Sequence, residues 1–273
     1  MRLSRIVTTL FLAVCSAGAN AHELWIEPEQ WQAPPAAEIN ANLVNGENFS
    51  GRRLAWKDRS TLRAERWDSD GSAPITGQPG DRPAFATTAP RDGLVTLLYQ
   101  STHKTVTYSD YDDFAGFLAE KGFEPLLQRH DERRLPPAPV KEAYARFSKA
   151  LVGAGSGQGA DAPRGLELEI VALSNPYTQP ADSDLRFQVL YRGDRLADNR
   201  VTVFRRDGAG TVETFHMQTD PAGTVAFKPE AGMVYLVDTV MIREPDRALV
   251  AETRGAVWES LWASLTFRAP EPQ

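Results

Sequence analysis

The sequence predicts a mainly β protein, with an N-terminal β-rich domain that includes two helices and a C-terminal Greek-key β-sandwich of the immunoglobulin or prealbumin type. Three observations lead to this fold class. Short alternating apolar runs bounded by turn residues recur along the chain, apolar stripes at helical spacing occur only between residues 113 and 152, and a Gly-rich stretch separates two halves. A chain of 273 residues has the length of one large or two medium domains, and the Gly-rich stretch favours two.

The first 21 residues have the features of a secretory signal peptide in the required order. Arg2 and Arg5 precede an apolar run, Ile6 to Val14, and Ala19-Asn20-Ala21 supplies the small residues of a cleavage site. The apolar run has nine residues, whereas a membrane-spanning helix needs about 20. We therefore expect export to the periplasm and a mature protein that starts at His22 without a membrane span.

The N-terminal domain is expected over residues 22–152. Alternating apolar and polar residues predict strands at His22–Ile26, Glu38–Leu43, Thr61–Trp67 and Leu94–Gln100. Apolar residues three and four positions apart then predict helices at Asp113–Lys121 and Val140–Val152. Each helix would have one apolar face with which to cover a sheet.

The Gly-rich residues 153–163 are expected to form a flexible, exposed linker, because glycine has little to bury and a high entropic cost of ordering. The β-sandwich domain is expected over residues 164–273. Seven short strands are predicted there, at Leu166–Leu173, Leu185–Arg192, Arg200–Arg206, Val212–Gln218, Thr224–Phe227, Met233–Ile242 and Trp262–Arg268.

Composition argues against several function classes. The chain has 36 acidic and 30 basic residues without a basic cluster, so nucleic acid is not an expected partner. Its one cysteine, Cys15, lies in the predicted signal peptide, so a metal site in the mature protein has to use nitrogen and oxygen ligands. Gly-x-Ser-x-Gly, Gly-x-x-x-x-Gly-Lys and His-Glu-x-x-His motifs are absent, and we do not expect an enzyme.

His22 is the first candidate metal ligand, because cleavage after Ala21 makes it the mature N-terminus. A free α-amine has an ordinary pKa of about 7.7–8.0 and gives up its proton to a metal, so the amine and ring Nδ1 form one bidentate chelate. A second imidazole would complete a histidine brace, which suits Cu(II) and also Ni(II). The alternative is that signal peptidase tolerates any residue after the cut and His22 has no role.

The other three histidines differ as partners for His22. His103 follows a predicted strand and His216 lies within one, so either reaches His22 only through tertiary folding. We favour His103, although no spacing rule separates the two. His130 lies among charged residues and is expected on a solvated surface. The candidate metal ligands are therefore His22, His103 and His216.

Four segments resemble a family of exported bacterial proteins. They are His22–Pro28, Asn45–Gly51, Tyr144–Leu151 and Trp258–Phe267, and they span nearly the whole mature chain. The family is a domain-of-unknown-function family related to periplasmic nickel/cobalt uptake components of the NikM type. The resemblance implies a periplasmic, two-part β-rich protein whose N-terminal histidine is a candidate ligand for a divalent transition metal (Cu, Ni or Co), and it makes a membrane transporter a candidate partner.

Two departures from that family bear on function. Transport-complex members carry a membrane anchor, which is not expected here after cleavage, and Val240-Met241-Ile242 stands where a Val-His-Met run is expected in relatives. The alternative function is a binding or adhesion module without metal, which exposed aromatic residues such as Trp258, Trp262 and Phe267 would favour. A copper enzyme acting on oxygen is a third interpretation, but the sequence shows no separate substrate signature.

Overall fold

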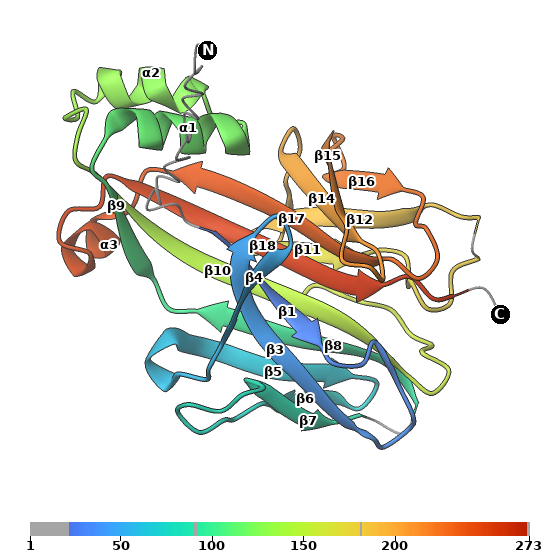
Figure 1. The fold of residues 1–273 in the computed structure, drawn as a ribbon. Helices are drawn as coiled ribbons and strands as arrows, with labels where there is room; N and C mark the ends of the chain where they lie inside the picture. Colours follow the sequence, from blue (N-terminus) through green and yellow to red (C-terminus); the bar gives the residue numbers. More distant parts are fainter. Residues whose placement is uncertain (1–21, 90–91, 181, 272–273) are drawn as a thin grey trace, which may run out of the picture.

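A computed structural model of the chain describes residues 22–89, 92–180 and 182–271. The predicted signal peptide, residues 1–21, lies outside the described residues. Strands form one ten-stranded sheet and two four-stranded sheets, one on each half of the large sheet (Figure 1). The prediction of a mainly β, sandwich-like protein is confirmed.

The ten-stranded sheet runs through the whole molecule. Its strands, in spatial order, are β15 (Val212–Gln218), β14 (Arg200–Arg206), β17 (Val234–Arg243), β18 (Trp258–Arg268), β10 (Val140–Ala154), β8 (Gly93–Ser101), β5 (Thr61–Asp68) and β6 (Gly71–Pro74). Two further strands pair with β10, namely β2 (Gln32–Ala33) and β9 (Lys104–Tyr108). The central pair, β10 and β18, is parallel, and the neighbouring pairs β17–β18 and β8–β10 are antiparallel.

The C-terminal four-stranded sheet completes the predicted sandwich. It contains β11 (Leu168–Ala172), β12 (Leu185–Tyr191), β13 (Asp194–Arg195) and β16 (Thr224–Phe227). Alternate residues of β11 and β12 pack with those of β14, β17 and β18 in one core cluster. Phe187 of β12 stacks on Phe267 of β18, with ring centroids 5.6 Å apart, and each such fully buried side chain stabilises the fold by about 1.5–3 kcal/mol.

The N-terminal four-stranded sheet contains β1 (Glu23–Pro28), β3 (Glu38–Glu47), β4 (Ser50–Leu54) and β7 (Phe85–Thr88). Leu24 and Ile26 of β1 pack with residues of β8 and β10 in a second core cluster. Hydroxyl groups of the large sheet also hold β1: Ser148 and Ser264 Oγ donate to the Leu24 carbonyl at 2.8 and 2.7 Å. These bonds fix the start of β1 against the middle of the large sheet.

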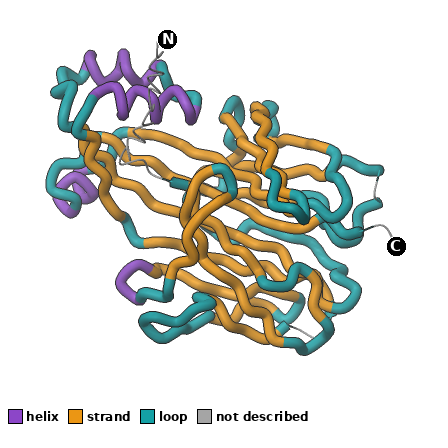
Figure 2. The backbone as a smooth tube through the Cα atoms, in the orientation of Figure 1, coloured by secondary structure: helices purple, strands orange, loops and turns teal. Residues whose placement is uncertain are grey.

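Three helices and one short 3-10 turn, Asp58–Ser60, complete the described residues (Figure 2). Helices α1 (Tyr111–Lys121) and α2 (Pro125–Glu132) bury apolar residues against one end of the sheet, and α3 (Arg247–Glu252) lies beside β10. The Asp110 side chain caps α1 by accepting from the Asp112 N–H. No described helix has the length and apolar character needed to cross a membrane.

The predicted helix at Val140–Val152 is wrong, because these residues form β10. The strand lies between β18 on one side and β8 and β9 on the other, and nearly all of its residues are buried. Its buried polar residues, such as Glu142, Ser148 and Lys149, form hydrogen bonds within the protein, so apolar and polar residues do not alternate along the strand. The apolar positions at helical spacing within it are therefore no guide to its conformation.

Residues 155, 156, 158–160 and 163 of the predicted linker are exposed as expected, but other residues of the segment are buried and hydrogen-bonded. Gly153 and Ala154 complete β10, and the Leu94 N–H donates to the Gln158 carbonyl at 2.7 Å. Asp161 is 8% exposed and bonds Lys149 Nζ at 2.6 Å. Since strands from both predicted domains join the same ten-stranded sheet, the boundary at 153–163 does not separate two sheets.

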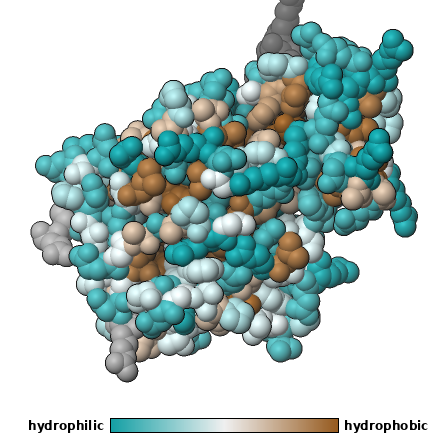
Figure 3. All heavy atoms as spheres, turned by 180° about the vertical axis from the view of Figure 1, so that it is seen from behind, coloured by the Kyte–Doolittle hydropathy of each residue, from teal (hydrophilic) through white to brown (hydrophobic). Residues whose placement is uncertain are grey.

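The described surface has little large apolar exposure. Seen from behind, hydrophobic residues gather in small patches surrounded by hydrophilic ones (Figure 3). Among the described residues, the large hydrophobic side chains that are exposed are Leu62 and Leu173. The aromatic residues of the last strand belong to the core, since Trp258, Trp262 and Phe267 are at most 2% exposed. They do not provide the exposed contact face that the adhesion alternative would use.

Candidate metal centre

His22 directly precedes β1 and contacts a carboxylate. The pairing of β1 with β3 places Glu23 opposite Gly46, so Glu47 at the end of β3 lies beside His22. His22 Nδ1 is 2.6 Å from Glu47 Oε1, and both side chains remain partly exposed. The His22 carbonyl accepts two hydrogen bonds from the Arg146 guanidinium, at 2.6 and 3.1 Å. His22 is thus held through its backbone while its ring faces an acid.

Glu47 also lines a cavity of about 220 Å³, here called the acidic pocket. The start of β1, the end of β3, the end of α1 and the strands β14 and β15 surround it. Its lining residues are Glu23, Glu47, Asn48, Glu120, Lys121, Thr202, Phe204, Thr214 and His216. His216 therefore lines the same pocket as Glu47, the acid that contacts His22.

His216 is placed by the pairing of β15 with β14, which sets it opposite Thr202. Its Nδ1 lies 3.1 Å from Thr202 Oγ1. Burial, together with the positive charges of Arg200 and Lys121, lowers the pKa of His216 below its usual range. At neutral pH the imidazole is therefore neutral, which is the form that binds metals.

One lysine neutralises part of the acidic pocket. Lys121 Nζ lies 2.7 Å from Glu23 Oε1 and 2.8 Å from Glu120 Oε1. Burial disfavours this ammonium, but the charges of Glu23, Asp238 and Glu120 raise its pKa above the ordinary value. Lys121 is therefore a fixed internal cation of the pocket.

The pocket lining carries three carboxylates, Glu23, Glu47 and Glu120, against one lysine, while the neighbouring Asp238 is mostly protonated at neutral pH. Asp238 of β17 is 2% exposed, and its burial, with the nearby charge of Glu23, raises its pKa to about 8. Glu23 Oε2 is buried and has no hydrogen-bond partner among the described residues. Sequence reasoning missed these acids, because only the pairing of β1, α1 and β17 places them together.

His103 lies elsewhere, in the turn between β8 and β9. Its Nε2 is 3.0 Å from Glu259 Oε1, and Arg243 also bonds that carboxylate, at 2.7 Å. The hydrogen bond to Glu259 raises the pKa of His103 above its usual value, against the effect of burial. This group shares no residue with the acidic pocket, whereas His216 lines that pocket together with Glu47, the acid that His22 contacts.

His130 does not lie on a solvated surface, and that prediction is wrong. It is fully buried, its Nδ1 accepts from Trp258 Nε1 at 3.0 Å, and its Nε2 lies 2.9 Å from the Pro136 carbonyl. Nδ1 therefore joins α2 to β18, and Nε2 joins α2 to the segment that follows it. The charged neighbours of His130 in the sequence concealed its inward orientation.

The donor set around His22 fits a nitrogen and oxygen chelate only in part. Among the described residues, no group of three or more His, Cys, Asp or Glu side chains is arranged ready to hold a metal ion. The α-amine of His22 would supply a further donor once the chain is cut behind Ala21, a bond outside the described residues. His22 would then supply two donors, the amine and Nδ1, and the neighbouring Glu47 carboxylate would supply a third.

The chain has low similarity to solved structures. It is similar to a tetra-tandem repeat in the extending region of a large adhesion protein (11% identity, TM-score 0.20), over 90% of this chain and 49% of that one. It is also similar to Escherichia coli alpha-2-macroglobulin activated by porcine elastase, with 8% identity and a TM-score of 0.22, over 90% of this chain and 20% of that one. For the trypsin-activated form of that protein the identity is 9% and the TM-score 0.21, over 93% of this chain and 16% of that one. The chain thus spans about half or less of these chains, and such TM-scores carry no argument about function.

No curated protein matches the chain. The family described as Domain of unknown function (DUF4198) matches residues 19–243, which is most of the chain and includes the start of β1, the acidic pocket and the ten-stranded sheet as far as β17. The chain therefore belongs to this family of unknown function, DUF4198.

Proposed function

We propose that the exported protein binds one divalent transition metal ion, Cu(II), Ni(II) or Co(II), through the mature N-terminal His22, and acts in periplasmic metal uptake or delivery. The predicted cleavage site directly before His22 supports the first half of this proposal. The resemblance to NikM-type components supports the second half, with a membrane transporter as the receiver of the metal.

The observation that carries the proposal is the contact between His22 Nδ1 and Glu47 Oε1 at 2.6 Å. A carboxylate in that position fixes the orientation of the imidazole in the metal-free protein. It is also placed to become a ligand when a metal binds Nδ1, because amine, imidazole and carboxylate donors together suit Cu(II) and Ni(II).

The acidic pocket supports the proposal through charge and through His216. Its acids outnumber Lys121, so the pocket attracts cations to the side of β1 on which Glu47 lies. The neutral His216 imidazole lines this pocket and is the proposed second imidazole ligand, after the amine and ring nitrogen of His22. His103 is bonded to Glu259 and takes no part.

The test is a Cu(II) and Ni(II) titration of protein secreted with a free His22, followed by calorimetry and by EPR of the copper complex. The matched control has the α-amine of His22 blocked by acetylation, which removes this donor from the chelate and leaves every side chain unchanged. We expect one-to-one binding by the first protein, with nitrogen hyperfine structure, and at least about a hundredfold weaker binding by the second. Equal binding by both proteins would contradict the proposal.

A further inference from the structure

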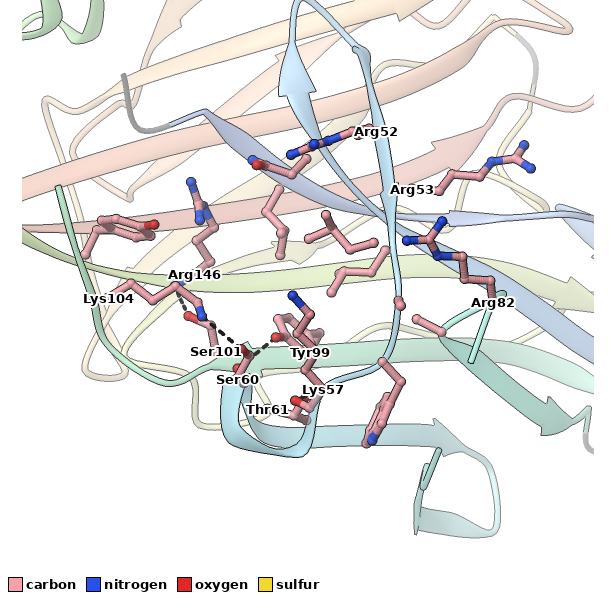
Figure 4. A pocket seen from close by; sticks show the side chains of 18 residues that line it. Arg52, Arg53, Lys57, Ser60, Thr61, Arg82, Tyr99, Ser101, Lys104 and Arg146 are labelled. Carbon is pink, nitrogen blue, oxygen red and sulfur yellow. Dashed lines mark hydrogen bonds between the residues drawn. The ribbon is translucent and has the colours of Figure 1, made fainter. Parts of the chain in front are cut away.

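A second cavity lies on the other face of β1 and has the opposite charge. It has a volume of about 370 Å³, within the range of about 300–1,000 Å³ that is typical of small-molecule sites. Residues of β1, β3 and β4 form one wall, and residues of β5, β8, β9 and β10 form the other (Figure 4). We call it the cationic cavity.

Six of its lining residues carry a positive charge and none is acidic. They are Arg52, Arg53, Lys57, Arg82, Lys104 and Arg146. None of the ion pairs formed between described residues involves any of the six. The chain as a whole has more acidic than basic residues, so this cavity is a local reversal of charge, and its cations come from four separate segments of the sequence.

Arg146 is the buried member of this set. It is 7% exposed, its guanidinium donates to the His22 carbonyl, and it lies 4.4 Å from the centre of the Tyr144 ring. A buried guanidinium is normally paired with a carboxylate, because a backbone carbonyl and an aromatic face offset only part of the cost of removing the charge from water. The positive charge of Arg146 can therefore be paired by an anionic ligand in the cavity.

The cationic groups also repel one another. Lys104 Nζ contacts Ser60 Oγ at 2.9 Å. Burial lowers the pKa of Lys104 below its ordinary value, and the positive charges of Arg146, Lys57 and Arg59 lower it further. Because these charges oppose each other in the free protein, an anion bound among them gains attraction and also relieves the repulsion.

Neutral groups of the cavity complete a site for an organic anion. The hydroxyl groups of Ser60 and Ser101 lie among the cations (Figure 4), and since each accepts a hydrogen bond from the protein, its own proton can be donated to an anionic oxygen. Buried Trp56 and Tyr99, with Leu24, provide apolar and aromatic surface next to them. A ligand that fits both features has charged groups at its ends and a carbon skeleton between them.

We propose that the cationic cavity binds a small organic polyanion, a molecule with two or more carboxylate or phosphate groups. Guanidinium groups recognise both kinds of oxyanion through paired hydrogen bonds, which is why carboxylate and phosphate ligands share this chemistry. Several charged groups are needed, because the cations surround the cavity from different strands. This function is independent of metal binding at His22.

The test is calorimetry on the full exported chain, freed of metal, with citrate as the polycarboxylate, pyrophosphate as the phosphate and acetate as the monovalent control. Arg52→Glu and Arg82→Glu reverse exposed charges at the cavity without breaking an ion pair. Lys228→Glu, an equally exposed residue directly after β16 in the other half of the molecule, is the matched control.

We expect citrate or pyrophosphate to bind one-to-one, and whichever binds more tightly identifies the charged group. Each cavity reversal weakens that binding by about tenfold or more, and Lys228→Glu leaves it within about twofold. The proposal is overturned if neither polyanion binds more tightly than acetate. It is also overturned if the cavity reversals change the affinity no more than Lys228→Glu does.

Discussion

The acidic pocket and the cationic cavity lie on opposite faces of the same strand, and consecutive residues of β1 line them. Glu23 points into the acidic pocket and Leu24 borders the cationic cavity, as the alternation of side chains along a strand requires. The pocket on one side contains its own counter-ion, Lys121, whereas the cavity on the other side contains none. A buried charge paired within the protein is part of the fold, while a group of unpaired like charges is a site for a ligand.

His22 and Arg146 connect the two regions. His22 contacts Glu47 of the acidic pocket through its ring and Arg146 of the cationic cavity through its carbonyl. The net charge of the chain conceals this arrangement, because it averages an acidic and a basic region that are separated by one strand.

Removing the internal counter-ion of the acidic pocket has the largest expected effect. Lys121→Met leaves the Glu23 carboxylate buried without its ammonium, next to Asp238, and we expect a loss of about 3–5 kcal/mol in the free energy of unfolding. Urea denaturation followed by tryptophan fluorescence measures it. Lys228→Met, at an exposed position, should change stability by no more than about 0.5 kcal/mol. A loss below about 1 kcal/mol for Lys121→Met would show that the pocket does not depend on its lysine.

The raised pKa of Asp238 makes stability depend on pH. Its folded pKa is about 8, whereas that of an unfolded Asp is about 3.9. Between these values the folded state holds a proton that the unfolded state has lost, so this group makes stability fall as pH rises, by up to about 1.4 kcal/mol per pH unit. Asp238→Asn removes this contribution.

We therefore expect the stability of Asp238→Asn, relative to the unchanged protein, to increase from pH 5 to pH 8. Above pH 8 the difference in the free energy of unfolding between the two proteins should no longer change with pH. The comparison isolates Asp238 from Glu142, whose pKa burial also raises, to about 7. Denaturation curves at each pH give the difference. A difference that does not change with pH would mean that Asp238 titrates alike in both states.

The two candidate partners of His22 should differ in their effect on metal affinity. We expect His216→Ala to weaken Cu(II) binding by about tenfold, because this imidazole lines the pocket beside Glu47. We expect His103→Ala to leave Cu(II) binding unchanged, because Glu259 and Arg243 hold that ring in another group. Calorimetry on both variants decides between them. An unchanged affinity in His216→Ala, or a loss in His103→Ala as large as that in His216→Ala, would contradict this assignment.

The smallest expected effect is a difference in salt dependence. Raising the salt concentration should weaken polyanion binding in the cationic cavity several-fold, because several of its cations are exposed and their attraction is screened. Arg82→Glu removes one attractive charge and adds a repulsive one, so its affinity should depend less steeply on salt. Titrations at three salt concentrations measure the slope. Identical slopes in both proteins would argue against a role for Arg82.

The sequence predicted most strands, because their alternation and turn residues are local properties. It failed at β10, where Val140, Tyr144, Phe147 and Leu151 match helical spacing although the strand is buried on both faces. Burial on two faces is decided by the neighbouring strands, and no local pattern reports them. The same reason explains why the burial of Asp161 was not predicted. The glycines of the segment 153–163 indicated exposure, whereas Asp161 is buried by its pairing with Lys149 of β10.

The candidate sites were less predictable than the fold. His22 was identified because its position after a cleavage motif is a local feature. Its neighbour Glu47 follows from the β1–β3 register, and His216 reaches the pocket through the pairing of β15 with β14. The cationic cavity collects residues between positions 52 and 146 whose charges are scattered in the sequence. Only tertiary structure turns them into one site.

The most direct measurement is a calorimetric cross-test of the two regions. Cu(II) and the tighter of citrate and pyrophosphate are each titrated into the unchanged mature protein and into Glu47→Gln and Arg82→Glu. We predict that Glu47→Gln weakens Cu(II) binding at least about tenfold and spares polyanion binding, and that Arg82→Glu does the reverse. If both ligands respond to the same substitution, or neither responds, β1 does not separate two sites of opposite charge.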